Sequence, residues 1–227
     1  MSLGYIEKNL TELLSEIKTL EKKHGREITL VAVTKSGSDD ELVALCQYGV
    51  TDIGENRPQQ LRRRADLLKE KGYAPALHEI GNLQKNKVKT IIEDVSLIHS
   101  LDSLSLAAEI DKQAGRVGRI VPVLVEVNSA REGQKGGIDP EVCEEFILSL
   151  KEFSNIRVAG LMTMGPVVED AELIRPYFRQ TRELFDRLNE KSLFEGGILS
   201  MGMSDSYRVA IEEGATLVRV GRKLFNR

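Results

Sequence analysis

A lysine at the end of an apolar segment is the residue most suited to covalent chemistry. Lys35 directly follows the run Leu30–Thr34, which is mostly aliphatic. Burial in an apolar wall disfavours the ammonium form, and a neutral amine is the form that attacks an aldehyde. The competing interpretation is a lysine whose charged end only reaches the solvent at the rim. Position in the sequence leaves both open, and the first predicts a Schiff-base lysine.

A serine and two glycines near the C-terminus form a second candidate group. Ser200, Gly202 and Gly221 follow short apolar runs. Glycine lets the backbone approach a ligand closely, and backbone N–H groups with a hydroxyl can bind an anion. Glycines that only form tight turns would give the same pattern. A phosphate-binding group of residues that faces a buried lysine indicates a functional site more strongly than either feature alone.

The elements that must position these residues are eight short strands alternating with helical segments. Alternation of this kind implies parallel pairing and right-handed crossovers, and we predict one (β/α)8 barrel domain over residues 1–227. An extra amphipathic helix over Ile6–Leu20 precedes it. A doubly wound open sheet is the structural rival. The predicted strands are Ile28–Lys35, Thr51–Asn56, Ala76–Gly81, Ser96–Leu101, Pro122–Asn128, Val158–Met164, Ile198–Met203 and Leu217–Gly221.

Several helix boundaries carry recognisable signals. Ser38 and Glu41 have the spacing of a capping box. Asp139 precedes a proline and predicts the start of a helix that runs to about residue 150. Ser204 is predicted to cap a helix that Gly214 ends. In a barrel, chemistry is found on the loops that follow the strands, where the candidate residues fall.

Other charged or titratable residues receive structural interpretations. Arg62–Arg64 is interpreted as a solvated helix face in preference to a partner-binding patch. His24, His78 and His99 lack metal-ligand spacing, and His78 is interpreted as a satisfied core histidine in preference to a catalytic one. Lys135 lies in a glycine-rich stretch and is a weak candidate for an anion contact.

Composition narrows the class of protein. The chain has 227 residues, a net charge of −3, 41% hydrophobic and 30% charged residues, which is typical of a globular domain and argues against general nucleic-acid binding. Its two cysteines, Cys46 and Cys143, give no disulfide framework or metal motif. Neither a secretion signal nor an apolar run of about 20 residues is found. We expect a cytoplasmic protein without a membrane partner.

With these features in hand, the sequence resembles the pyridoxal phosphate homeostasis protein family. These are single-domain barrels related to the N-terminal domain of alanine racemase, and the resemblance runs from Leu30 to Phe225. It lies in several short segments that occur in order and at predicted strand ends. They are Val31–Lys35, Gly54–Asn56, His78–Lys87, Gly160–Met162, Leu199–Asp205, Ala210–Ile211, Gly214 and Val218–Gly221.

The resemblance implies roles for individual residues. Lys35 would hold pyridoxal 5′-phosphate (PLP) as a Schiff base, and Asn56 would lie near the ring. Arg219 would face the pyridine nitrogen, which keeps that nitrogen unprotonated and weakens the cofactor as an electron sink. The phosphate would be held in the loops that contain Ser200, Gly202 and Gly221.

The chain also departs from the family pattern. Arg57 stands where an aromatic residue is usual, and Glu79 replaces an apolar one. Arg222 and Lys223 replace a hydroxyl residue and another small residue. Loss of the hydroxyl at 222 removes one expected phosphate contact, for which the backbone N–H or the side chain of Arg222 would substitute.

The sequence also helps to distinguish a PLP carrier from an enzyme. A PLP-dependent racemase needs acid and base groups on both faces of the substrate carbon. Alanine racemases take one such group, a tyrosine, from a second domain of the partner subunit. We expect no such domain here, because the sequence ends shortly after the last predicted strand. None of Tyr5, Tyr48, Tyr73, Tyr177 and Tyr207 falls on a predicted strand end. We therefore expect a PLP carrier or regulator of PLP and amino-acid pools with little or no turnover.

Two rival functions remain at this point. One is a slow PLP-dependent racemase or lyase, and the other is a Schiff-base aldolase or phosphosugar enzyme in which Lys35 attacks the substrate. For the carrier, we expect PLP as the ligand, transient transfer to PLP-dependent apoenzymes, no nucleic-acid partner, and a monomer.

Overall fold

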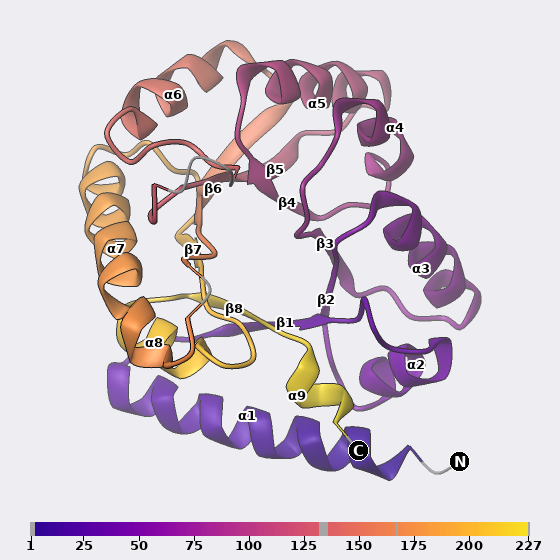
Figure 1. Ribbon diagram of the computed structural model, residues 1–227. Helices are drawn as coiled ribbons and strands as arrows, with labels where there is room; N and C mark the ends of the chain where they lie inside the picture. The colour runs from indigo at the N-terminus through magenta and orange to yellow at the C-terminus, as the bar shows by residue number, and fades with distance from the viewer. Residues whose placement is uncertain (1–2, 132–135, 167, 227) are drawn as a thin grey trace.

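The structure is a closed barrel of eight parallel strands in the order β1 to β8, surrounded by helices (Figure 1). It is a computed structural model that describes residues 3–131, 136–166 and 168–226, so the candidate Lys35 lies within it and Lys135 outside it. The closed barrel confirms the predicted fold and excludes the open sheet. All eight predicted strands are present, with boundaries shifted by a few residues.

The elements follow one another in a regular alternation. They are α1 Gly4–His24, β1 Thr29–Val33, α2 Asp39–Gln47, β2 Asp52–Glu55, α3 Pro58–Glu70, β3 Ala76–Glu79, η1 Lys85–Lys87, α4 Val88–Ile91, β4 Leu97–Leu101, α5 Leu104–Arg116, β5 Val121–Glu126, α6 Cys143–Ser149, η2 Leu150–Glu152, β6 Ile156–Met162, η3 Ala171–Ile174, α7 Arg175–Glu190, β7 Ile198–Ser200, α8 Tyr207–Glu212, β8 Leu217–Val220 and α9 Arg222–Phe225.

Successive residues of each strand belong alternately to two apolar layers. Residues such as Ala32 and Ile53 point outward and belong to the large cluster between the strands and the helices. A smaller cluster fills the interior of the barrel and includes Val31, Leu124 and Met162. Residues of one strand thus face either the helices or the interior, which decides what each polar side chain can reach.

The extra N-terminal helix is present and closes one side of the barrel. In α1, Ile6, Leu10, Leu13 and Ile17 are buried, as the periodicity predicts. The side-chain amide of Asn9 donates to backbone oxygens at the C-terminal end of the chain, at 2.7 and 3.2 Å. Figure 1 shows α1 lying beside α8 and α9, so the first helix supports the loops that follow β7 and β8.

Helix starts show where local signals were sufficient. Ser38 and Glu41 form both bonds of the predicted capping box at the start of α2. The prediction for Asp139 is wrong, because α6 begins only at Cys143 and the Asp139 carboxylate accepts the Glu141 amide in a turn. The predicted cap at Ser204 is also wrong, because α8 begins at Tyr207. Among the described residues, none of the helices combines the length and the apolar character needed to cross a membrane.

Candidate functional site

The lysine loop, residues 34–38, leaves the barrel at the end of β1. Thr34 is fully buried, whereas Lys35 is exposed and lies in a turn in which the Gly37 amide donates to the Thr34 carbonyl at 2.9 Å. The expectation that burial would surround Lys35 is therefore wrong. The reason is that β1 ends at Val33 and the chain turns at once, so only the backbone before the lysine lies in the wall. Lys35 thus lies at the end of the barrel where the strands finish.

A buried ionic cluster holds this loop from behind. The Thr34 hydroxyl donates to Glu55 Oε1 at 2.5 Å, and the Arg64 Nε lies 3.6 Å from the same oxygen. The Arg64 guanidinium also donates to the Gly37 carbonyl and to the Asp39 carboxylate. The side chains of Arg64 and Glu55 are each only 1% exposed, so the interpretation of residue 64 as part of a solvated face is wrong. Arg64 instead joins the lysine loop to α3.

Two carboxyl groups lie next to each other on β2 and β3, where Glu55 is paired in register with Glu79. Burial raises the pKa of Glu55 despite the contacts from Thr34 and Arg64. Burial also raises the pKa of Glu79 to about 8, with a further contribution from Glu55, although the Gly81 amide donates to it. Within the described chain, one oxygen of each carboxyl has no hydrogen-bond partner. Glu79 is therefore largely protonated at neutral pH.

Asn56 follows β2 at the same end of the barrel as Lys35 and is partly buried. A Cβ atom on Gly81, which follows β3, would lie 2.4 Å from the Asn56 carbonyl oxygen. Only glycine fits at that close approach. The glycine in the β3 loop thus sets the path of the backbone at Asn56.

Arg219 is a buried cation on the inward face of β8. Its guanidinium donates to the Ser200 hydroxyl and, at 3.1 Å, to the carbonyl of Thr163. Burial lowers its pKa to about 10, so it remains protonated at neutral pH. Glu126 on β5 interacts with it electrostatically, and burial, together with Asp102, raises the pKa of Glu126 to about 7. The sequence placed Glu126 near the end of the predicted strand Pro122–Asn128 but gave it no role, because its inward position depends on the barrel.

The three histidines separate into two environments. His78 has both ring nitrogens in contact, with Asp52 at 3.0 Å and with His99 at 2.9 Å. It is 4% exposed, which confirms a satisfied histidine in the interior. His99 Nδ1 lies 3.0 Å from Ser200 Oγ in the interior, whereas His24 lies on α1.

The loops after β7 and β8 meet through a serine that the sequence interpretation assigned to another role. The Gly221 amide donates to the Ser204 hydroxyl at 3.2 Å. The Ser200 hydroxyl, by contrast, is fully buried and faces Arg219 and His99 inside the barrel. Gly202 has φ +91°, and a Cβ there would lie 2.5 Å from the side chain of Ala210. The turn that brings Ser204 toward Gly221 therefore requires glycine at 202.

Arg222 and Lys223, the two departures from the family pattern, each have a partner. Arg222 donates to Asp205, which joins the two loops, although both side chains are 74% exposed. Lys223 lies 3.0 Å from Glu16 of α1 and 2.9 Å from the Tyr207 hydroxyl. Burial acts to raise the pKa of Glu16, but bonds from Tyr207, Arg208 and Lys223 lower it to about 2.

The lysine loop and the β8 loop are in contact. A Cβ atom on Gly221 would lie 3.0 Å from the Val33 carbonyl oxygen, two residues before Lys35. A Cβ on Gly37 would lie 2.7 Å from the ring of Phe225. Because β8, β1 and β2 are neighbours, the residues after these strands gather on one side of the barrel end. Lys35, Asn56, Gly221 and Arg222 are thus brought together, with Arg219 deeper in the interior.

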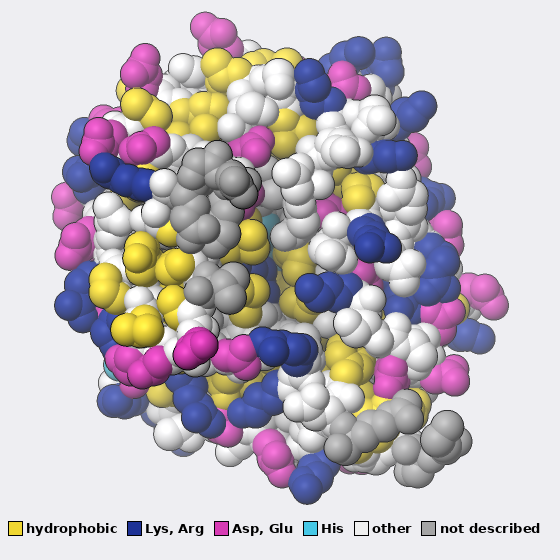
Figure 2. Space-filling view, in the orientation of Figure 1, with side chains coloured by type: hydrophobic (Ala, Val, Ile, Leu, Met, Phe, Trp, Pro, Cys, Tyr) yellow, Lys and Arg dark blue, Asp and Glu magenta, His cyan; other side chains and the backbone are white. Residues whose placement is uncertain are grey.

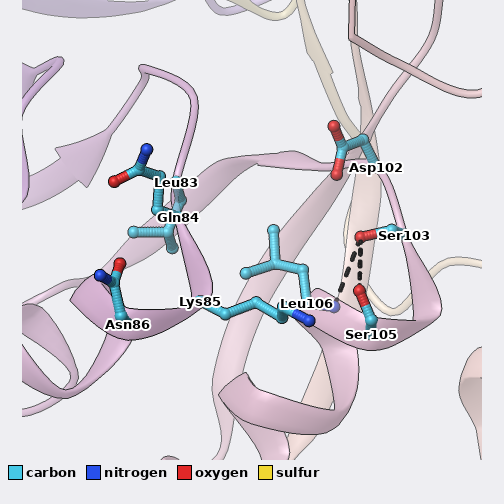
Figure 3. A pocket seen from close by; sticks show the side chains of 8 residues that line it. All are labelled: Leu83, Gln84, Lys85, Asn86, Asp102, Ser103, Ser105 and Leu106. Carbon is cyan, nitrogen blue, oxygen red and sulfur yellow. Dashed lines mark hydrogen bonds between the residues drawn. The ribbon is translucent and has the colours of Figure 1, made fainter.

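The surface at this end of the barrel carries side chains of different kinds. Basic and apolar side chains lie together around the centre of the face in Figure 2. A groove of about 490 Å³ lies beside it, between the β3 loop and the start of α5 (Figure 3). In that view the Lys85 side chain extends across the groove toward Ser105. This groove is separate from the residues that surround Lys35.

All five tyrosines lie outside the strands. Tyr5 and Tyr207 donate to Glu41 and Glu16, outside the barrel. The others lie in α7, after α2 and before β3. The expectation that no tyrosine occupies a strand end is confirmed.

Residues 9–226 match the model of the family described as alanine racemase, N-terminal domain. A pyridoxal phosphate homeostasis protein of Aquifex aeolicus is 40% identical over 219 residues, which is 95% of each chain. One from Helicobacter pylori is 34% identical and covers 98% of this chain and 99% of its own. The chain belongs to the pyridoxal phosphate homeostasis protein family.

Solved structures agree with this assignment. PipY of Synechococcus elongatus with PLP bound has a TM-score of 0.85 and 29% identity, covering 97% of this chain and all of its own. The form of PipY without PLP has a TM-score of 0.87. An alanine racemase of Clostridium difficile, at 19% identity and a TM-score of 0.77 over 97% of this chain and 60% of its own, shares the fold.

Proposed function

We propose that this family member binds PLP at the C-terminal end of the barrel, with Lys35 as the covalent anchor. Its role would be in intracellular PLP and amino-acid homeostasis, with little or no catalytic turnover. The observation that carries the proposal is the contact between the β1 and β8 segments, where Gly221 lies against Val33. It supports the proposal because Lys35 follows β1, the candidate anion-binding groups follow β7 and β8, and β8 is the neighbour of β1. PLP binding by PipY, named in its solved structure, supports the same ligand.

The residues present fit the parts of PLP. The exposed Lys35 amine is able to form a Schiff base, in which its nitrogen replaces the aldehyde oxygen and water is released. The Ser204 hydroxyl, which accepts the Gly221 amide, keeps its own proton to donate to the phosphate, and Arg222 adds a positive charge. Ser200 and Gly202 contribute by position: Ser200 contacts Arg219, and Gly202 permits the turn before Ser204. When bound, PLP supplies an electron-withdrawing ring.

Low turnover is supported by Arg219. A guanidinium remains protonated at neutral pH, so a ring nitrogen beside it would accept a hydrogen bond without taking up a proton. An unprotonated ring withdraws electrons less strongly. Asn56 lies at the level of the lysine loop and is suited to contact the ring. The location of the tyrosines outside the barrel gives no support to a tyrosine acid or base, as a racemase would need.

The lysine assignment is tested by reduction and peptide mapping. Borohydride treatment of PLP-loaded protein should attach a reduced pyridoxyl phosphate group to the peptide that contains Lys35. Lys35→Ala should lose the yellow colour while its stability changes by less than about 0.5 kcal/mol, because the side chain is exposed. Lys35→Arg is the matched control, since it keeps the charge but cannot form the linkage.

Label on another lysine, with Lys35 unmodified in saturated protein, would contradict the proposal. Turnover of D- or L-amino acids in proportion to PLP content, and lost in Lys35→Ala, would show that the protein is an enzyme. Colourless protein that is trapped only with a sugar phosphate would indicate an aldolase.

A further inference from the structure

A continuous row of polar side chains crosses the interior of the barrel. It runs from Asp52 on β2 through His78 on β3, His99 on β4 and Ser200 on β7 to Arg219 on β8. Consecutive members are in contact, with His78 Nε2 3.0 Å from Asp52 Oδ1, His78 Nδ1 2.9 Å from His99 Nε2, and His99 Nδ1 3.0 Å from Ser200 Oγ. An Arg219 N–H donates to Ser200 Oγ.

The two ends of the row lie toward opposite ends of the barrel. Asp52 is the first residue of β2 and lines, with His78, Thr29 and Leu217, a cavity of about 330 Å³ at the end where the strands begin. Arg219 lies nearer the end that carries the lysine loop. The row therefore connects the proposed cofactor site to a carboxylate on the far side of the molecule.

The end members fix the direction of every hydrogen bond between them. A carboxylate only accepts, so His78 carries a proton on Nε2. A neutral His78 then accepts on Nδ1, which requires a proton on Nε2 of His99. The remaining nitrogen of His99, Nδ1, is an acceptor and takes the proton of the Ser200 hydroxyl. Arginine only donates, so the Ser200 oxygen presents a lone pair to Arg219.

The opposite direction would leave a buried group unsatisfied. If His78 were doubly protonated, His99 would donate to Ser200, whose oxygen would accept from both His99 and Arg219. The hydroxyl proton would then need a third partner. Ser200 is fully buried, and His99 and Arg219 are its side-chain contacts in the described part of the chain. Burying a donor without a partner costs roughly 1–3 kcal/mol, which favours the first direction.

We propose that Asp52, His78, His99 and Ser200 form a hydrogen-bond chain of a single direction that fixes Arg219 toward the cofactor ring. They are positioning residues for Arg219, and the proposal rests on the proposed PLP site. The Ser200 hydroxyl has its proton committed to His99 and acts only as an acceptor for the guanidinium. Asp52 selects this arrangement from the far end, without contact with the cofactor.

The environment of His99 agrees with a neutral chain. Burial holds the pKa of His99 well below its usual value, and the Arg219 guanidinium adds to the effect. Arg219 also donates a hydrogen bond to the Thr163 carbonyl. The Thr163 hydroxyl is in turn hydrogen-bonded to the Val127 carbonyl and the Ser129 hydroxyl. The guanidinium thus has two fixed acceptors, one of which depends on the chain.

Nitrogen-15 NMR of the histidine rings in the PLP-free protein tests the direction of the chain. At pH 7, His78 and His99 should both be neutral, and each ring should carry its proton on Nε2. A His99 ring with its proton on Nδ1, or a doubly protonated His78, would overturn the proposal. This readout does not depend on cofactor or activity.

Substitutions test whether the chain reaches the cofactor. Ser200→Ala should weaken PLP binding about tenfold, the effect of losing one hydrogen bond to a charged group. It should also shift the absorption band of bound PLP. His99→Leu should reproduce part of both effects. His99→Gln should restore the wild-type PLP affinity and absorption band, because the side-chain amide supplies one donor and one acceptor.

The control is Ser100→Ala on the same strand as His99. Ser100 is also buried, and its hydroxyl has no partner among the described residues. This variant should change PLP affinity by less than about twofold. Equal effects of Ser100→Ala and Ser200→Ala, or failure of His99→Gln to restore binding while the protein is folded, would contradict the chain.

The outcomes separate this inference from the proposed function. Wild-type protein that takes up no PLP would remove the proposed function and the role of the chain, even with the expected tautomers. Normal PLP uptake on Lys35 with the wrong tautomers would overturn only the chain.

Discussion

The two sides of the proposed PLP site are held in different ways. The lysine side, residues 34–38, is fixed by Arg64 and Glu55, which are almost fully buried. The phosphate side, formed by the β7 and β8 loops, is fixed by exposed or half-exposed pairs, such as Arg222 with Asp205 and Lys223 with Glu16. Buried ionic contacts are costly to break, whereas exposed ones contribute little. The proposed anchor loop is thus held by contacts that are costly to break, and the proposed anion side by contacts that are not.

The largest effect is expected from removing the buried guanidinium. Arg64→Met should lower the free energy of unfolding by about 3 kcal/mol, because it breaks the contacts to Glu55, Asp39 and the Gly37 carbonyl. Chemical denaturation measures the change. Arg63→Met is the matched control on the same helix, since Arg63 also binds Asp39 but is 49% exposed, and it should cost less than about 1 kcal/mol. Equal costs for Arg64→Met and Arg63→Met would contradict the claim that burial makes the contacts on the lysine side costly to break.

Glu79 gives the lysine side a pH dependence. Its folded pKa of about 8 lies above the ordinary 4.5, so the folded state binds more protons between these values. Stability should therefore fall as pH rises from about 4.5 to 8. Glu79→Gln keeps an acceptor for the Gly81 amide and should be more stable than wild type by about 2 kcal/mol at pH 8.5. At pH 4.5 the two should unfold alike.

Glu145→Gln, at an exposed position on α6, controls for the loss of a carboxylate. A constant difference between Glu79→Gln and wild type across this pH range would contradict the raised pKa.

Glu16 gives the phosphate side the opposite dependence. Its folded pKa of about 2 lies below the ordinary 4.5, so the stability from its contacts is present above about pH 4.5 and lost as pH falls toward 2. Because its side chain is 34% exposed, Glu16→Gln should cost only about 1 kcal/mol at pH 7. The cost should disappear in acid unfolding near pH 2. Glu12→Gln, one turn earlier on α1 and 58% exposed, is the control.

The smallest effect on stability is expected at Arg222. Arg222→Ala should change the free energy of unfolding by less than about 0.5 kcal/mol but weaken PLP binding about threefold to tenfold, through loss of a charge near the phosphate. Asp205→Asn breaks the same pair and keeps the cation, so it should not weaken binding. Equilibrium dialysis of PLP distinguishes them, and equal losses in both variants would show that the ion pair, and not the cation, matters.

The fold could be predicted from residue order. Alternation of aliphatic runs with helical patterns depends on local periodicity, so all eight strands and α1 were found. The positions of Lys35 and Gly221 after strands could likewise be predicted, whereas their roles stay a prediction. The burial of Arg64 had a local signal that the run of three arginines hid, because Arg64 has helical spacing from Leu61 and Leu68 on the buried face of α3. Its partners could not be predicted, because they depend on how α3 packs against the lysine loop.

What sequence alone determined was the barrel, the family and the strand ends that meet at the site. Tertiary structure decided which face each polar side chain occupies. Ser200 ends β7 and Ser204 lies four residues later in the loop after it, yet one faces Arg219 in the interior and the other faces Gly221 outside it. The physical reason is that a strand alternates sides while a turn redirects the chain, and closure of the barrel then joins residues from β2, β3, β4, β7 and β8 that are far apart in sequence.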